Sequence, residues 1–396
     1  MVNAVHHKKR GNQSSARAGR YVTEPGGFRA FVRAPLASRA AYTIAGDLRR
    51  QLSEADRALG RLDGSVLTLP NPDLFVFMYV RKEAVLSSQI EGTQSSLQDL
   101  LAAEAHILGA RLPRDVDEVV NYVGAMNHGL ARLSKLPVSV RLIREIHAEL
   151  LKGVRGSNLT PGELRRSQNW IGPAGCTLAE ATFVPPPAAE VPDALNALEK
   201  FVHDDALPLL VKVGVAHAQF ESIHPFLDGN GRIGRLLITF LLCERRALHK
   251  PVLYLSHFFK RHRQEYYDKL QAVRDTGNWE SWLAFFLSGV AEVSLEAAET
   301  ARKILELREL HRKSITDHLG RAAGNGHRIL ERLCERPITS VAEVRALLGT
   351  TFAGANQIVQ RLEHLKILAE ITGQDRNRRF RYEAYVSLFD DKATKA

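Results

Sequence analysis

The sequence is poor in cysteine and has no long apolar run. Its three cysteines, Cys176, Cys243 and Cys334, lie far apart without a CxxC pair, so neither a disulfide framework nor a zinc site is indicated. The longest apolar run, LLITFLLC at 236–243, is too short to span a bilayer, and the first twenty residues lack the apolar centre of a secretory signal. These absences exclude a secreted disulfide scaffold and indicate no membrane partner. They predict a cytoplasmic location.

Length and composition are those of a globular chain with two or three domains. The 396 residues are 45% hydrophobic and 25% charged. The net charge of +10 arises mostly near the N-terminus, because residues 1–50 contain ten Lys and Arg but only two Asp and Glu. We expect residues 1–28 to form a basic, disordered tail. A solvated tail is the commoner explanation of such a charge run, and contact with a polyanion is the alternative.

Apolar residues recur at three- and four-residue spacing along most of the chain, which predicts a mainly α fold. Residues 28–40 are expected to be irregular, and helical patterns then fill an N-terminal region at 29–135. No strand-rich stretch appears before residue 155, so a doubly wound α/β sheet is excluded. Two extended runs around a Gly/Pro turn at 163–187 predict a β-hairpin.

The segment HPFLDGNGRIGR at residues 224–235 is the most informative part of the sequence. His224 precedes a proline, which favours extended dihedrals, so it should end one helix. A second helix, apolar on nearly every side, begins near Gly231. Between them, glycines and the exposed amides of a helix start allow an anion to approach closely. The segment therefore predicts a phosphate-binding loop between two buried helices.

Charged and titratable residues in this loop could bind phosphates, hold a metal ion and accept a proton. Arg232 and Arg235 supply two cationic forks suited to separate phosphates of one polyphosphate. Asp228 offers an oxygen ligand for a magnesium ion that bridges a carboxylate and a nucleotide. His224 can accept a proton near neutral pH. GNGRIG at 229–234 also matches GxGxxG, but no βαβ unit surrounds it, which argues against a dinucleotide site.

The same segment matches HPFxDGNGRxxR, the signature of the Fic family, at every fixed position, so the chain resembles that family. The resemblance implies a Fic-type helical core at residues 136–295. It also implies transfer of AMP from ATP to a Ser, Thr or Tyr hydroxyl of a target protein or of the chain itself. A relative that phosphorylates its target departs from the DGNGR pattern, whereas this chain keeps it with Gly229. Adenylyl transfer is therefore favoured over phosphoryl transfer.

The resemblance also assigns roles to single residues. His224 would deprotonate the target hydroxyl, and Asp228 would hold Mg²⁺. Asn230 with the Gly231 region would cradle the α-phosphate, and the two arginines would hold the outer phosphates. The full set of candidate ATP-binding residues is Glu91, Glu221, Phe226, Leu227, Gly229, Asn230, Gly231, Arg232, Arg235, Tyr266 and Tyr267.

The hairpin at 163–187 corresponds to the target-docking flap of the family, with SQNWIG and ATFVPPP as its edges. An edge strand beside the site can pair with the main chain of a target, and a surface hairpin without this role is the alternative. The segment EYYDKLQAVRDTGNW resembles the family segment that packs beside the nucleotide base. Because aromatic residues at helical spacing are more often core, we expect at most one of Tyr266 and Tyr267 to border adenine.

Ser87 and Glu91 lie four residues apart on one face of the helix VRKEAVLSSQIEG. With Gly92, they resemble the Fic inhibitory motif (S/T)xxxE(G/N), here N-terminal to the core. The resemblance implies that Glu91 pairs with Arg235 and occupies the cation that the γ-phosphate of ATP needs. Some autoinhibited relatives also remove AMP with the same glutamate, so reverse de-AMPylation stays open.

The last hundred residues, 296–396, have a different pattern. A charged linker helix precedes two short helices, the first capped by Ser340 and Glu343 and ended by Gly349, and then a strand-turn-strand. This order resembles a winged helix-turn-helix. Residues that could contact DNA are Asn356, Gln357, Arg376, Arg378, Arg379 and Arg381. A protein-docking or homodimerisation domain is the alternative, and a nucleotide-sensing, DNA-binding transcriptional regulator is the alternative to an enzyme.

Overall fold

The computed structural model describes residues 17–34, 36, 42–67, 69, 72–107, 112–173 and 175–390. The chain is mainly α-helical with short antiparallel strands, as the sequence predicts. In chain order the helices and strands are β1 (Gly19–Thr23), β2 (Arg29–Arg33), α1 (Gly46–Leu67), α2 (Asp73–Ile90), α3 (Leu97–Glu104), α4 (Val116–Leu133), α5 (Val140–Leu150), α6 (Val191–His203), α7 (Leu209–Ile223), α8 (Asn230–Glu244), α9 (Ser256–Arg261), α10 (Arg263–Thr276), α11 (Trp279–Leu319), α12 (Ala323–Glu335), β3 (Ile338–Ser340), α13 (Val341–Leu348), α14 (Phe352–His364), β4 (Ala369–Glu370), β5 (Arg379–Arg381) and α15 (Glu383–Val386).

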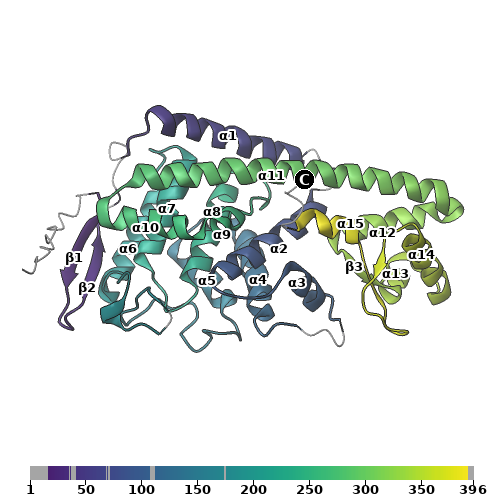
Figure 1. Ribbon diagram of the computed structural model, residues 1–396, viewed down its shortest axis with the longest axis horizontal. Helices are drawn as coiled ribbons and strands as arrows, with labels where there is room; N and C mark the ends of the chain where they lie inside the picture. The colour runs from purple at the N-terminus through teal and green to yellow at the C-terminus, as the bar shows by residue number, and fades with distance from the viewer. Residues whose placement is uncertain are drawn as a thin grey trace, which may run out of the picture.

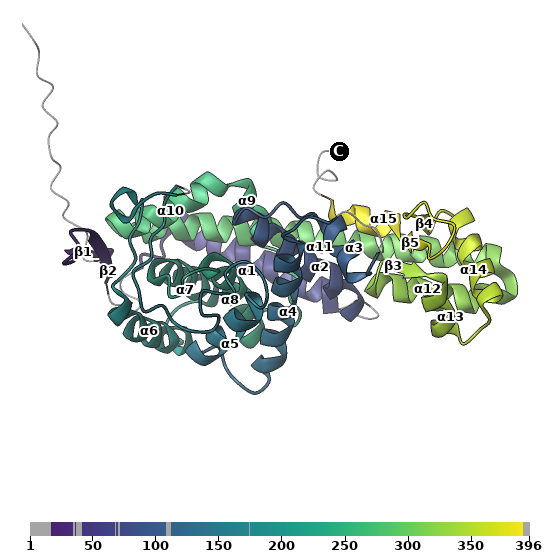
Figure 2. The same cartoon turned by 90° about the horizontal axis from the view of Figure 1, so that it is seen from below.

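The 41-residue helix α11 connects the helical body to a C-terminal module formed by α12–α15 and β3–β5. Figure 1 shows α1 lying along α11 in the body, while the far end of α11 leads into the module. Figure 2 shows the same extension from below. The charged linker helix predicted from residue 296 is the second half of α11, so the chain has no break between the predicted core and the predicted linker.

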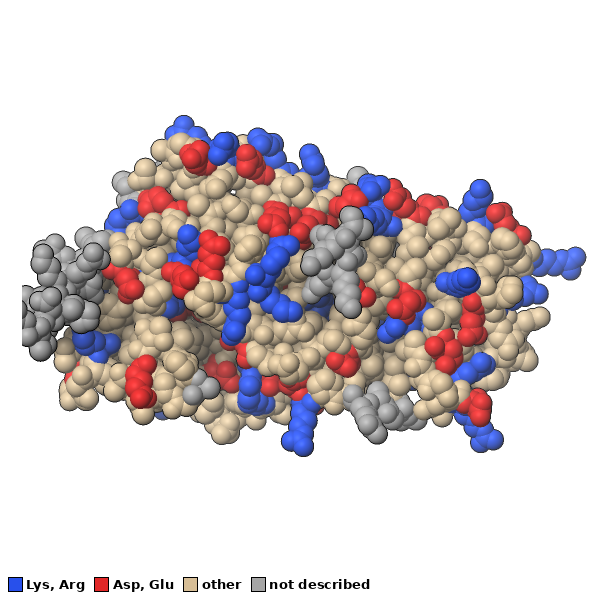
Figure 3. All heavy atoms as spheres, in the orientation of Figure 1, with Lys and Arg blue, Asp and Glu red and all other residues tan. Residues whose placement is uncertain are grey.

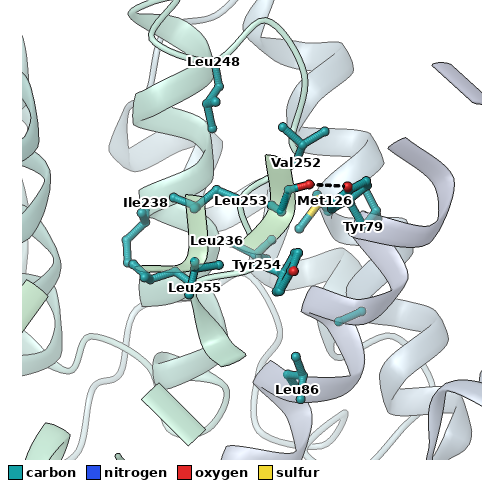
Figure 4. Close-up of a cluster of buried hydrophobic side chains, with 14 of the residues drawn as sticks. Tyr79, Leu86, Met126, Leu236, Ile238, Leu248, Val252, Leu253, Tyr254 and Leu255 are labelled. Atoms are coloured by element: carbon teal, nitrogen blue, oxygen red, sulfur yellow. Dashed lines mark hydrogen bonds between the residues drawn. The ribbon is translucent and has the colours of Figure 1, made fainter. Parts of the chain in front are cut away.

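Helices α7 and α8 form the centre of the body. Both are buried along nearly their whole length, as expected for helices without a polar face. Buried side chains form one continuous cluster that extends from the body into the module. Figure 4 shows the part of this cluster where α2, α4 and α8 meet the segment after α8, with Tyr79, Leu86, Met126, Leu236, Ile238, Leu248, Val252, Leu253, Tyr254 and Leu255.

The N-terminal part of the chain is more ordered than the sequence predicts. Strands β1 and β2 form an antiparallel hairpin in which Gly19 lies opposite Arg33. The prediction of a disordered tail is therefore wrong for residues 17–28, and the prediction of an irregular stretch is wrong for 29–33. Residues 1–16 lie outside the described residues. Alternating side chains around the EPGG turn were the readable signal for this hairpin.

The segment 163–187 folds back on itself but contains no regular strand. One antiparallel bridge joins Ile171 to Phe183, and the Phe31 amide of β2 donates to the Val184 carbonyl. The predicted hairpin is thus reduced to a single bridge, because its three consecutive prolines supply no amide donors for a longer ladder. Its second edge is covered by the N-terminal hairpin.

The C-terminal module has the element order helix, strand, helix, helix, strand, strand, helix. Its sheet has the order β3-β5-β4, with both pairs antiparallel. The predicted cap by Ser340 is confirmed, since its side chain accepts from the Glu343 amide, and Gly349 ends the helix with φ 65°. The capping box is incomplete, because the Glu343 carboxylate accepts from the Ser340 hydroxyl. Strand β3 was not predicted, and the end of the predicted second strand is helix α15 instead.

By length and composition alone, the described residues contain one helical stretch long enough and apolar enough to cross a membrane, Trp279–Glu335. Its most apolar window is 61% buried inside the protein, as is usual for a core helix. The sequence-based expectation had found no such segment because it considered only uninterrupted apolar runs.

Candidate active site between helices α7 and α8

The α7–α8 loop begins with a residue in an unusual backbone conformation. His224 follows the last residue of α7 with φ 48° and ψ 61°, which is the left-handed region. The prediction of an extended His224 is therefore wrong, although the predicted end of the helix is confirmed. Outside glycine, this conformation costs about 1–2 kcal/mol, so other contacts must hold it. The His224 carbonyl accepts from Arg165 Nε at 2.9 Å and from Asn169 Nδ2 at 3.2 Å.

The loop is closed by Asn230, the first residue of α8. Its Oδ1 accepts from the Phe226 amide and its Nδ2 donates to the Phe226 carbonyl, both at 2.8 Å. Both ends of the side-chain amide are thus bonded within the loop, so Asn230 shapes the loop and offers its backbone amide to a ligand. Phe226 is buried and stacks on His147, whereas Leu227 is half-buried.

Asp228 lies half-exposed beside the start of α8, with 31% of its side chain accessible. Its Oδ1 accepts from the Gly229 amide at 2.6 Å. Behind it, His147 Nε2 bonds the Asp228 carbonyl at 3.0 Å, and His147 Nδ1 accepts from the Gly162 amide. Because Nδ1 is an acceptor, Nε2 must carry the proton. Burial lowers the pKa of His147 to about 4, which keeps this neutral tautomer at neutral pH.

The N-terminus of α8 carries a carboxylate from α2. Glu91 Oε1 would lie 2.2 Å from a Cβ on Gly231, so only glycine leaves room for it. Arg235 Nη2 donates to the same oxygen at 2.7 Å, and the Arg235 fork also bonds the side chain and carbonyl of Ser87. The predicted contact of Glu91 with Arg235 is confirmed. Burial favours the neutral acid, but Arg235 overcomes this and lowers the pKa of Glu91.

Arg232, the second predicted phosphate ligand, also has a protein partner. It is 1% exposed, its Nη1 donates to Glu118 Oε2 at 3.0 Å, and its Nη2 lies 3.6 Å from Asp228 Oδ1. Glu118 comes from α4 and is itself buried. Glu118 was not predicted as a site residue from the sequence. A glutamate on the apolar face of a helix nevertheless indicates a buried charged partner.

His224 is half-buried and neutral. Burial, together with the positive charges of Arg274 and Arg165, lowers the pKa of His224 to about 3, against the opposing charge of Glu91. Its Nδ1 is buried without a hydrogen-bond partner among the described residues. An unprotonated imidazole can accept a proton at neutral pH.

Glu221 lies one turn before His224 on α7. Its side chain is 6% exposed and leans over Gly234, and Oε1 has no hydrogen-bond partner within the described part of the chain. Burial, opposed by the positive charge of Arg235 and assisted by the negative charge of Glu91, raises the pKa of Glu221 to about 7. The Glu221 carboxyl is therefore partly ionised at physiological pH.

The two candidate adenine-bordering tyrosines differ in exposure. Tyr266 is buried, and its hydroxyl bonds His217 Nε2 at 2.8 Å, so its ring belongs to the core. Tyr267 is 37% exposed, and Arg263 lies over its ring. Burial raises the pKa of Tyr267, and the negative charge of Glu91 contributes to the same shift. Tyr267 is thus the one tyrosine of the pair that can border a ligand.

The arrangement fits a nucleotide with its magnesium. An anionic carboxylate already rests against Gly231 and Arg235 at the start of α8, where backbone amides and the helix dipole favour a phosphate. For the metal, the described residues contain no cluster of three or more metal-ligating side chains. Asp228 alone would therefore hold Mg²⁺, with phosphate oxygens and water completing the shell, which is the usual way that proteins bind Mg²⁺ with nucleotides.

Comparisons with known proteins agree with this geometry. Residues 49–131 match the Fic/DOC family N-terminal model, and residues 137–242 match the Fic/DOC family model. Among curated proteins, a protein adenylyltransferase Fic from Aedes aegypti is 34% identical over 141 residues, covering 35% of this chain and 25% of that protein. The one from Drosophila persimilis is 31% identical over 185 residues, covering 44% and 33%. The chain thus spans about a quarter to a third of the curated relatives it matches.

Solved structures show the same fold. A Fic family protein from Desulfovibrio desulfuricans G20 aligns with a TM-score of 0.56 at 19% identity, covering 86% of this chain and 97% of that one. A Fic domain containing signaling protein from Bacteroides thetaiotaomicron aligns with a TM-score of 0.51 at 18% identity, covering 64% and 97%. The two matched segments of this chain, residues 49–131 and 137–242, therefore belong to the Fic/DOC family.

Proposed function

We propose that the protein transfers AMP from ATP to a Ser, Thr or Tyr hydroxyl of a target protein or of itself. The observation that carries this proposal is the anion site at the start of α8, where a carboxylate rests between Gly231 and Arg235 in the same loop as a neutral His224. Relatives that cover part of this chain are named protein adenylyltransferases, which supports the same reaction.

In the proposed reaction, the target hydroxyl oxygen forms a bond to the α-phosphorus of ATP. The bond from the α-phosphorus to the oxygen that bridges to the β-phosphate breaks, and pyrophosphate leaves. His224 takes the hydroxyl proton, and its depressed pKa keeps the imidazole unprotonated at neutral pH before this step. The first amides of α8 face the charge that develops on the phosphate. Mg²⁺ held by Asp228 would neutralise charge on the phosphates and the leaving group.

We further propose that Glu91 inhibits this reaction. Its carboxylate occupies Arg235, which the γ-phosphate needs, and would repel a phosphate brought close to it. Displacing Glu91 would free Arg235 while Ser87 still holds the other side of the guanidinium. Transfer should therefore be slow in the wild type and faster when Glu91 is removed.

The test compares wild type, Glu91→Gly and His224→Ala, incubated with magnesium, cell lysate and ATP labelled at the α-phosphate. Glu145→Gly is a matched control, because Glu145 of α5 also pairs with arginines, Arg132 of α4 and Arg141 of α5, that are not part of the loop. We expect label on protein to increase at least tenfold with Glu91→Gly, to disappear with His224→Ala, and to stay at the wild-type level in the control. Label from the γ-phosphate instead of the α-phosphate would contradict adenylyl transfer.

The same labelled protein tests the reverse reaction. After removal of ATP, wild type that uses Glu91 to position water would release AMP from labelled target, whereas Glu91→Gly would not. Retention of label in both samples would exclude de-AMPylation by Glu91.

A second proposal concerns the C-terminal module, whose element order and β3-β5-β4 sheet fit a winged helix that binds DNA. A groove of about 610 Å³ lies between α14 and the β4–β5 connection, lined by Asn356, Arg376, Arg378 and Arg379 among others. However, Arg378 bonds Asn356, Arg379 bonds Glu343 and Arg381 bonds Glu383. Basic and acidic side chains are also interspersed on the face of the module that Figure 3 shows.

DNA retardation by wild type that is lost with Arg376→Ala and Arg378→Ala would support this second proposal. Retardation without any transfer of label from ATP would favour a nucleotide-sensing regulator over the enzyme. Absence of retardation at low salt, where phosphate contacts are strongest, would exclude the DNA interface.

A further inference from the structure

Arg165 is a buried arginine without an acidic partner. It lies at the base of the 163–187 segment and is 2% exposed, and no carboxylate among the described residues lies within ion-pair distance of it. Burial alone lowers the pKa of Arg165 to about 10. Burying a charge without a counter-ion costs several kcal/mol, so the structure must compensate through hydrogen bonds.

Those hydrogen bonds all go to backbone carbonyls, and they join three segments of the chain. Nε donates to His224, Nη1 to Ser167, and Nη2 to Pro186 and, at 3.4 Å, to Ile223. The Arg165 amide also donates to the Pro225 carbonyl at 2.9 Å. One guanidinium therefore connects the end of α7 to both edges of the segment that resembles a target-docking flap.

The contact with His224 matters because that residue is left-handed directly before a proline. Its carbonyl has two side-chain donors, Arg165 and Asn169, and Asn169 also donates to the Phe226 carbonyl at 2.8 Å. Both donors belong to the 163–187 segment, so these side chains join the backbone of His224 to that segment.

We propose that Arg165 is a positioning residue for the transfer reaction, holding the imidazole of His224 and the target-docking segment in a fixed relation. The proposal rests on the adenylyl transfer proposed above. It assigns to Arg165 no contact with ATP, since all of its described bonds are made to the protein.

The test uses Arg165→Lys and Arg165→Met in the Glu91→Gly background, with Arg166→Met as the matched control. Arg166 is the next residue, and it is exposed. Lysine keeps the charge but lacks the planar fork that reaches several carbonyls at once. We expect kcat for target labelling to fall about 100-fold in both Arg165 variants, the usual effect of a small misplacement of reacting groups. The Kd for ATP with magnesium, measured by calorimetry, should change less than threefold.

The pH profile separates the two Arg165 variants. The charged and polar groups that face His224 are Arg165, Arg274 of α10, Glu91 at the end of α2 and the backbone carbonyl of Glu221 on α7. Glu91 is replaced by glycine in the background used for this test. Loss of the Arg165 charge raises the pKa of His224, so the acid limb of kcat should move to higher pH in Arg165→Met than in Arg165→Lys. An acid limb that stays in place in Arg165→Met would contradict close contact between the Arg165 charge and His224.

A second measurement needs no transfer activity. His224–Pro225 is the only His-Pro pair in the sequence, so protein labelled with ¹³C-carbonyl histidine and ¹⁵N proline gives one coupled NMR signal, from the His224 carbonyl. We expect this signal to shift in Arg165→Met and to stay in place in Arg166→Met. If Glu91→Gly shows no transfer, the proposed function fails, and this signal still decides the role of Arg165.

Three results would overturn the proposal: an unchanged carbonyl signal in Arg165→Met, a kcat within threefold of the parent, or a loss of ATP affinity as large as the loss of kcat. If Arg165→Met does not fold, Arg165→Lys and Asn169→Ala decide. Removal of the Asn169 donor should shift the same signal and lower kcat in the same direction by a smaller factor.

Discussion

Two arginine–glutamate pairs of almost equal length lie in the two parts of the molecule. Arg232 and Glu118 are 3.0 Å apart beside the α7–α8 loop, and Arg379 and Glu343 are 3.1 Å apart in the C-terminal module. Their side chains are 1% and 7% exposed in the first pair but 21% and 56% exposed in the second. Distance therefore does not distinguish them, and burial does.

The difference extends to the surroundings of each pair. Near the loop, charged groups are buried, one histidine is left-handed, and two polar atoms, His224 Nδ1 and Glu221 Oε1, have no partner among the described residues. In the module, the charged side chains of the β4–β5 region pair near water. Left-handed residues and a buried polar atom without a partner occur in the module as well, at Lys366, Asn377 and His327 Nδ1. The burial of charged groups is therefore what distinguishes the loop from the module.

The largest predicted effect is on the buried pair. Arg232→Met removes the cation and leaves Glu118 buried with only the surface residue Arg155 near it. We expect the free energy of unfolding, measured by urea denaturation, to fall by about 3–5 kcal/mol. A loss below 1 kcal/mol would mean that Arg155 or water replaces Arg232, and the contrast between the two pairs would disappear.

A second prediction uses the pH dependence of a buried carboxyl. The folded pKa of Glu221 is about 7, against an ordinary value of 4.5. Between these values the unfolded chain ionises while the folded protein stays neutral, so wild type loses about 1.4 kcal/mol of stability for each pH unit of increase. Glu221→Gln does not titrate, so relative to wild type it should gain about 3 kcal/mol in unfolding free energy between pH 5 and pH 8.

Glu145→Gln is the control for this prediction. The hydrogen bond from Arg132 lowers the pKa of Glu145, so its titration lies below pH 5 in both the folded and unfolded states. Its difference from wild type should therefore be the same at pH 5 and pH 8. An equal difference at both pH values for Glu221→Gln as well would show that water reaches the Glu221 carboxyl in the folded protein.

The sequence predicted the parts of the site that are contiguous in the chain. The helix ends on either side of 224–235 follow from local patterns, and the Glu91–Arg235 contact follows from the resemblance of two short motifs. Glu118, Arg165 and His147 were missed, because each acts through a partner 59 or more residues away that no local pattern specifies. The left-handed His224 was missed for the same reason, since the pre-proline preference is local and the bonds that override it are not.

Three short strands were not predicted from the sequence, whereas β4 and β5 lie within the predicted strand-turn-strand. β1 and β2 have five residues each and β3 has three, so their periodic patterns are too short to outweigh the charged or irregular composition around them. Strands of this length depend on partners such as Val184 and on the packing of the module. The fold class, which rests on long helices, was not affected.

The smallest predicted effect completes the comparison of the two pairs. Arg379→Met makes the same substitution as Arg232→Met, in an ion pair of the same length, but its glutamate is mostly solvated and keeps a hydrogen bond from Ser340. We expect a loss of no more than about 1 kcal/mol in unfolding free energy, falling further in 0.5 M salt, because exposed pairs gain little over hydration and are screened. A loss as large as that of Arg232→Met would show that the Arg379 stem, packed in the β3-β5-β4 sheet, stabilises the module through burial of its apolar part.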